Sequence, residues 1–185
     1  TSEHLYSTTM DTSGGESAFA VGANGTFILT EDFGVTWITM DTGVSVDLNV
    51  IGFLGNTVTM AGDDGTLIQT TDGVDYTTVV TGTSENINGG EVFGPEASDW
   101  AYFVGDDGYV IWTDDSGDNW TIDTTETSTN LAGAGSYGET TYVTGPSGAL
   151  YYDGGSSTPA WEGPVTSGSE WTFTASGSNL MWKAA

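Results

Sequence analysis

The chain has 185 residues, of which 37% are hydrophobic and 12% aromatic, which is enough for one compact domain over residues 1–185. Its charge is extreme, because 26 Asp and Glu face a single basic residue, Lys183, giving a formal net charge of −25. Since phosphate backbones and anionic lipid surfaces are bound through Lys and Arg, we expect no nucleic-acid partner and no membrane insertion.

Such a charge makes a compact fold repel itself at low ionic strength. At molar salt the Debye length falls to about 3 Å and most of this repulsion is screened. Near-complete loss of Lys, with acidic residues spread over the whole chain, resembles the proteins of extreme halophiles. We therefore expect the fold to need high salt. The alternative is an acidic secreted or surface protein that uses Ca²⁺ as its counterion.

Along the chain, one segment occurs four times, and each copy reads as an apolar strand, a Gly-x-x-Gly turn and a second apolar strand. The copies cover residues 18–30, 58–70, 101–113 and 141–152. The second glycine of the turn falls at positions 25, 65, 108 and 148, so the copies are 40, 43 and 40 residues apart. Glycines at both ends of a short turn supply the positive φ angles of a tight hairpin. The regular spacing indicates a repeat architecture.

A second element, with the pattern Thr-x-Asp-x-Gly-x-x-Trp, follows the hairpin. Its pattern residues in the first and third copies are Thr30, Asp32, Gly34 and Trp37, and Thr113, Asp115, Gly117 and Trp120. The second copy contains Asp72, is one residue shorter and ends in Tyr76, and the fourth, at 152–155, is degraded. An Asp carboxylate accepts backbone N–H groups within its own turn, and we expect the Trp ring to be buried beneath it. We interpret this element as a turn that stabilises the fold.

These turns resemble the Asp-box, or bacterial neuraminidase repeat, of β-propellers. The longer pattern, in which a Val-Gly-x-x-Gly turn and a strand precede Thr-x-Asp-x-Gly-x-Thr-Trp, is similar to the propellers of the photosystem II stability and assembly factor family. The resemblance covers most of residues 16–165 and implies an all-β propeller. It implies little about function, since such repeats occur in many unrelated proteins.

Two further strands are predicted between successive hairpins, at 37–40 and 48–53 and at 120–123 and 131–134, giving the four strands of a propeller blade. Residues 172–182 align without gaps with 18–28, and residues 5–12 resemble 36–42. We therefore expect a five-bladed propeller whose composite last blade is closed by N- and C-terminal strands, which would remove exposed sheet edges. The alternatives are four blades plus a hairpin, or an open array of sheets completed by another subunit.

The composition argues against an enzyme. Sialidases among the Asp-box propellers hold their substrate carboxylate with Arg, and this chain has none. The only His, His4, lies near the N-terminus, so a nucleophilic triad is not expected. A glycoside hydrolase, which needs two carboxylates, is a lesser alternative for which no pair stands out. We predict no catalytic residues and no required cofactor.

Asp-rich turns are candidate sites for Ca²⁺ or Mg²⁺, which prefer oxygen ligands. The candidate ligands are Asp63, Asp64, Asp106, Asp107, Asp114, Asp115 and Asp118. Asp-Asp-Gly is also ordinary turn sequence, which is the structural alternative.

Three tryptophans lie outside the regular Trp position of the repeat: Trp100, Trp161 and Trp171. If exposed, they would stack on a sugar ring or anchor a protein interface, and otherwise they fill the core between blades.

A scaffold without a catalytic constellation favours a non-enzymatic structural or interaction module with protein partners. Our first hypothesis is a virion or cell-surface component, such as a capsid, spike or tail protein, of a halophilic organism or its virus. Its partners would be other virion or surface subunits, and its location extracellular or on the virion, with the cytoplasm of an extreme halophile as the alternative. The second hypothesis is a carbohydrate-binding, lectin-like propeller that binds glycans.

Overall fold

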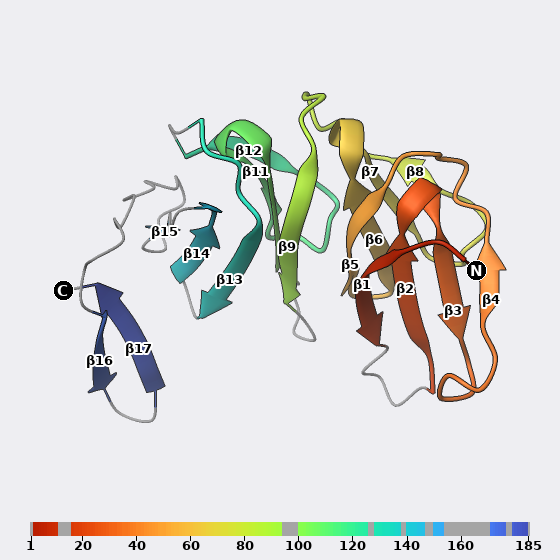
Figure 1. The fold of residues 1–185 in the computed structure, drawn as a ribbon, viewed down its shortest axis with the longest axis horizontal. Helices are drawn as coiled ribbons and strands as arrows, with labels where there is room; N and C mark the ends of the chain where they lie inside the picture. Colours follow the sequence, from red (N-terminus) through yellow and green to blue (C-terminus); the bar gives the residue numbers. More distant parts are fainter. Residues whose placement is uncertain are drawn as a thin grey trace.

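The computed structural model describes residues 2–10, 16–93, 100–125, 128–137, 140–146, 150–153, 171–176 and 179–184. These residues form five antiparallel sheets, and the first four follow one another in chain order across the molecule (Figure 1). The prediction of an all-β fold is confirmed. Within the described ranges, no helix is long and apolar enough to cross a membrane.

Three complete sheets of four strands, which we call the first, second and third blades, form the larger part of the structure. The first contains β1 (Leu5–Met10), β2 (Ala18–Gly22), β3 (Phe27–Thr30) and β4 (Ile38–Met40). The second contains β5 (Leu48–Leu54), β6 (Thr57–Gly62), β7 (Leu67–Thr70) and β8 (Thr77–Thr78). The third contains β9 (Ile87–Phe93), β10 (Trp100–Gly105), β11 (Tyr109–Thr113) and β12 (Thr121–Thr124).

The fourth blade has three described strands, β13 (Gly133–Tyr137), β14 (Thr140–Thr144) and β15 (Leu150–Asp153). The fifth sheet is a hairpin of β16 (Trp171–Ser176) and β17 (Asn179–Ala184). The strands predicted between the hairpins are confirmed at β4, β5, β12 and β13.

The N-terminal strand does not close a composite last blade, and that prediction is wrong. β1 pairs with β2, from Leu5 opposite Gly22 to Met10 opposite Ala18. β1 also contacts β5, β5 contacts β9, and β9 contacts β13, so these four are the inner strands of successive blades. The carbonyl of His4 accepts a hydrogen bond from Ala23, as the carbonyl of Asp47 does from Asp63. Residues 4–10 therefore repeat the inner strand, and their likeness to the outer strand at 36–42 is compositional.

The C-terminal hairpin also differs from its predicted alignment. Ser176 lies opposite Asn179, so two residues connect the strands. The same two-residue connection joins the first and second strands of the second blade, where Leu54 lies opposite Thr57. The Gly-x-x-Gly hairpin is longer, as Val21 lies opposite Phe27. The alignment of 172–182 with 18–28 is therefore wrong, because β16 and β17 pair as the first two strands of a blade do.

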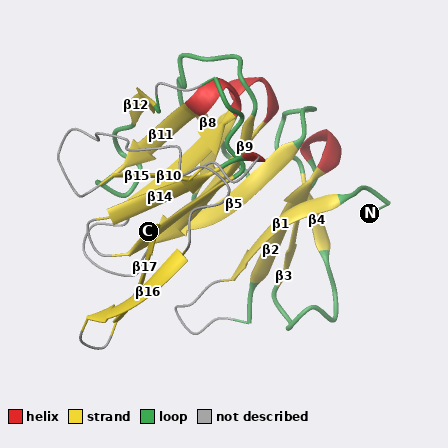
Figure 2. Cartoon of the chain, turned by 60° about the vertical axis from the view of Figure 1, so that its left-hand side comes forward, coloured by secondary structure: helices red, strands yellow, loops and turns green. Residues whose placement is uncertain are grey.

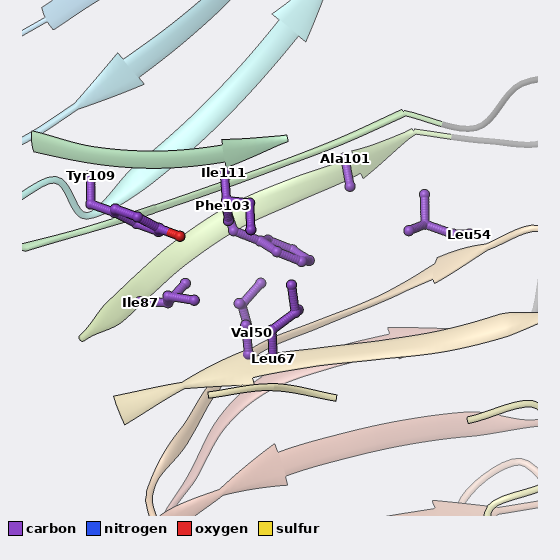
Figure 3. Close-up of a cluster of buried hydrophobic side chains, with 9 residues drawn as sticks. Val50, Leu54, Leu67, Ile87, Ala101, Phe103, Tyr109 and Ile111 are labelled. Atoms are coloured by element: carbon purple, nitrogen blue, oxygen red, sulfur yellow. The ribbon is translucent and has the colours of Figure 1, made fainter. Parts of the chain in front are cut away.

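The core lies between adjacent blades, so each interface is filled from two sheets. Val21 and Phe27 of the first blade pack with Leu48 and Met60 of the second. Between the second and third blades, Val50, Leu54 and Leu67 face Ile87, Phe103 and Ile111 (Figure 3). Between the third and fourth, Tyr102, Val104 and Val110 pack with Leu131 and Val143. Burying these apolar faces against one another is what orders the blades side by side.

Candidate functional site

In the first three blades the two kinds of turn lie at opposite ends, because the third strand begins at one and ends at the other. The Gly-x-x-Gly turns contain the three short 3-10 segments Ala23–Gly25, Asp63–Gly65 and Asp106–Gly108, which gather at one end in Figure 2. The Asp turns, which we define as residues 30–37, 70–76 and 113–120, leave the other end of β3, β7 and β11.

At the Gly-x-x-Gly end, positive φ angles occur at the residue before the second glycine and at that glycine: 55° and 64° at Asp64 and Gly65. The first glycine, Gly62, is instead extended, with φ of −172°. The expectation of positive φ at both glycines is therefore wrong for the first one. A Cβ on Gly62 would clash with the carbonyl of Asp47, so the close approach of the inner strand requires this glycine.

The same end also carries polar contacts between neighbouring blades, made by asparagines of the inner strands. Asn49 donates from Nδ2 to Oδ1 of Asp63 in its own blade, at 2.9 Å, and to the carbonyl of Ile87 in the next blade, at 2.9 Å. Asn88 repeats this with Asp106, at 2.8 Å, and with the carbonyl of Leu131, at 2.9 Å.

A second set of contacts runs from the turn of one blade to the start of the next inner strand. The backbone N–H of Asn24 donates to Oδ1 of Asp47, at 2.9 Å, and that of Asp64 donates to Oδ1 of Asn86, at 3.1 Å. Sequence reasoning missed both sets. The signal was present, since Asp47-Leu48-Asn49 and Asn86-Ile87-Asn88 stand at corresponding positions where the inner strands begin.

The candidate cation ligands are distributed over these turns. Asp63 and Asp106 accept the inner-strand asparagines, and Asp115 accepts donors of its own turn. Asp64 and Asp107 carry the positive-φ position of their turns. Asp114 and Asp118 lie exposed in the third Asp turn. In the part of the chain that the structure describes, no three His, Cys, Asp or Glu side chains come together as a metal site would require. A bound divalent cation stays a prediction.

Within the Asp turns, one carboxylate organises the backbone. Oδ1 of Asp32 accepts the N–H of Thr36 at 2.8 Å and the hydroxyl of Thr30 at 2.8 Å, and Oδ2 accepts the Thr36 hydroxyl at 2.6 Å. The N–H of Gly34 donates to the Thr30 hydroxyl at 2.9 Å. Asp115 accepts the corresponding bonds from Thr113 and Asn119 in the third blade.

Hydrogen bonds to a carboxylate favour its charged form, so they lower its pKa. The pKa of Asp32 is lowered chiefly by the hydroxyl of Thr36, and that of Asp115 by the backbone N–H of Asn119. In the second blade, the pKa of Asp72 is lowered chiefly by the backbone N–H of Asp75. These carboxylates are therefore ionised when they accept the hydrogen bonds that stabilise their turns.

The two tryptophans of the motif differ in burial. Trp120 stacks on Phe103, with ring centroids 5.5 Å apart, and donates from Nε1 to the carbonyl of Gly117 at 3.1 Å. Trp37 is 47% exposed, so the predicted burial of this ring is wrong. Trp120 packs on the core between the second and third blades and Tyr76 on the core between the first and second, whereas Trp37 belongs to neither of these clusters.

Of the tryptophans outside the motif, Trp100 begins β10 and is 36% exposed. Trp171 begins β16, and Trp161 lies outside the described residues. The structure therefore leaves the ligand role of these three rings a prediction.

The first Asp turn has an apolar surface that sequence reasoning did not single out. Phe33 is 78% exposed and Val35 is 81% exposed, beside the half-exposed Trp37 and Ile38. The signal was the pair of unspecified positions on either side of the motif Gly, which are apolar in this copy and are Ser116 and Asp118 in the third.

No family model matches the chain, and no curated protein matches its sequence. Among solved structures, it is similar to YCF48 bound to D1 peptide, with a TM-score of 0.64, 17% identity and a match over 89% of this chain and 53% of that chain. It is also similar to YCF48 from Cyanidioschyzon merolae, with a TM-score of 0.65, 16% identity and a match over 92% of this chain and 59% of that chain. The chain thus spans between half and three fifths of the length of these structures. With the four-stranded sheets, this similarity establishes that the chain has a β-propeller fold.

Proposed function

We propose that this protein is a non-enzymatic interaction module that binds protein partners on a rigid propeller scaffold. The observation that carries the proposal is the similarity, over 89% of the chain, to a propeller whose solved structure is described as YCF48 bound to D1 peptide. Peptide binding is thereby a use that this architecture supports. Which partner this chain binds does not follow from that similarity.

The chemistry of the chain supports a binding role rather than catalysis. Asp32, Asp72 and Asp115 each have a lowered pKa and are engaged in hydrogen bonds that hold turns. A catalytic acid needs a raised pKa, and a lowered one points to structure here. The sequence adds no Arg and only one His, His4.

The proposal includes a setting. We infer an Asp-box propeller of a halophilic organism or its virus, placed on a virion or cell surface, with other surface subunits as partners. The support is the net charge of −25 and the carboxylate-centred turns of the first three blades. A lectin-like function is the second candidate, favoured by the exposure of Trp100 at the start of β10.

Crosslinking in the native source tests the proposal. Because Lys183 is the only lysine, amine-reactive reagents would report little, whereas a dihydrazide reagent that joins activated carboxylates can use 26 acidic residues. We expect crosslinks to one or a few defined proteins at near-stoichiometric yield. Recovery of the chain as a free monomer without crosslinks would contradict the proposal, and selective binding on a glycan array at high salt would favour the lectin.

A further inference from the structure

The first Asp turn presents four apolar side chains to solvent: Phe33, Val35, Trp37 and Ile38, which we call the apolar turn. Their exposed fractions are 78%, 81%, 47% and 50%. In a chain with so high a charge, large side chains this exposed and this close together in sequence mark an interaction surface rather than incidental exposure.

The turn does not need apolar side chains at the positions of Phe33 and Val35. The third blade builds the same turn, with the same Thr–Asp hydrogen bonds, around Ser116 and Asp118. Phe33 also occupies a left-handed backbone position, with φ of 56°, as Ser116 does with 63°. A bulky residue is rare at positive φ, and Phe33 recovers little burial in return. Stability therefore does not explain the presence of Phe33.

The turn holds the backbone that carries Phe33 and Val35 in a fixed arrangement. Asp32 ties its two ends through Thr30 and Thr36, and the backbone N–H of Phe33 donates to the carbonyl of Glu16 at 3.2 Å. A rigid anchor loses little conformational entropy on binding, so its apolar area contributes more fully to affinity.

We infer that the apolar turn is the anchor of a protein interface, and that its partner presents an apolar face bordered by Lys and Arg. This inference rests on the proposed interaction function and names its surface. The argument for the partner is charge: Glu31 and Asp41 are exposed at the two ends of this segment, and the whole chain carries −25. A second copy of the chain would bring like charges together, which disfavours self-association.

The test uses a defined probe, a short amphipathic helical peptide with Leu on one face and Lys on the other, titrated at the lowest salt at which the protein is folded. The variant Phe33→Ser/Val35→Asp gives the first turn the residues of the third at these two positions. We expect it to weaken peptide binding at least tenfold while melting at or above the wild-type temperature. A peptide with Glu in place of Lys should not bind.

The control is Val80→Asp. Val80 is 85% exposed and follows β8, at the end of the blades opposite the Asp turns. The substitution Val80→Asp adds one negative charge, as the double variant does. If the Lys peptide bound through charge alone, both variants would therefore bind it more tightly than the wild type. We expect Val80→Asp to change the affinity less than twofold.

Equal affinities for the wild type and the double variant would overturn the inference, as would no binding of the Lys peptide, equal binding of the Glu peptide, or self-association of the wild type that the double variant abolishes. Each of these leaves the proposed function standing if native crosslinks map to other surfaces. Absence of native crosslinks would instead remove the proposed function itself.

Discussion

Replacement of Asn88 by Ala tests the polar contacts that join neighbouring blades. The side chain donates to Asp106 in its own blade, at 2.8 Å, and to the carbonyl of Leu131 in the next, at 2.9 Å. A hydrogen bond to a charged group contributes about 1.5–3 kcal/mol and a neutral one about 0.5–1.5 kcal/mol. Because the site is only part-buried, water replaces some of this, and we expect a loss of about 2 kcal/mol in the free energy of unfolding.

For a domain of this length, about 2 kcal/mol lowers the melting temperature by roughly 4–8 °C. The assay is thermal unfolding followed by circular dichroism at constant salt, after reversibility has been established. The matched control is Asn119→Ala, which removes an amide-to-carboxylate bond of 2.6 Å to Asp115 within one exposed turn. We expect a loss below about 1 kcal/mol there, since the backbone N–H of Asn119 still holds Asp115 and water reaches the site. If Asn88→Ala melts at the wild-type temperature, the contacts between blades do not stabilise the fold as argued. The same follows if Asn119→Ala loses as much free energy of unfolding as Asn88→Ala.

Three further predictions concern charge, pH and close packing. Lowering the salt should unfold the chain, because its charge of −25 is then unscreened, and a far-UV spectrum unchanged in dilute buffer would refute the halophilic interpretation. Since the folded pKa of Asp115 is lowered from 3.8, its contribution is present above that pH and is lost as pH falls through the folded pKa. At high salt, Asp115→Asn should therefore reduce the fall in the free energy of unfolding as the pH is lowered. The same fall in the wild type and the variant would count against this role. Gly62→Ala should be more destabilising than Gly43→Ala, because a Cβ at 62 meets the Asp47 carbonyl, whereas one at 43 meets nothing within 4 Å and adds only the strain of a φ of +72°. Equal melting temperatures for these two variants would show that the inner strand can move.

The hairpins of the repeat were predictable because their chemistry is local. Gly62 to Gly65 carry the whole turn, and the strands on either side of them pair through it. The same holds for Asp32, whose hydrogen-bond partners all lie within four residues of it. Side chains that act within one turn leave their signal in one short stretch of sequence.

The N-terminal strand and the motif tryptophans show which features a local sequence pattern does not predict. The composition of residues 5–12 suits an outer strand, and only the pairing of Leu5 with Gly22 identifies an inner one. Trp37 and Trp120 occupy the same motif position, yet of the two it is Trp120 that packs on the core between two blades, where it stacks on Phe103 of β10. Strand identity and burial depend on partners that are distant in sequence, which a motif does not encode.

The contacts between blades also show how a chain almost without cations satisfies its structural carboxylates. Asp47 accepts the Tyr6 hydroxyl at 3.0 Å and the N–H of Asn24 at 2.9 Å. Asp63 accepts an asparagine amide, and Asp32 accepts hydroxyl and backbone donors. All of these donors are neutral, so they satisfy hydrogen bonding and leave the negative charge in place. The charge must then be balanced by ions from solution, which follow the salt concentration. Stability of this fold should accordingly rise with salt even where every hydrogen bond is intact, and a salt dependence equal in the wild type and in Asn88→Ala would separate this screening from the bonds themselves.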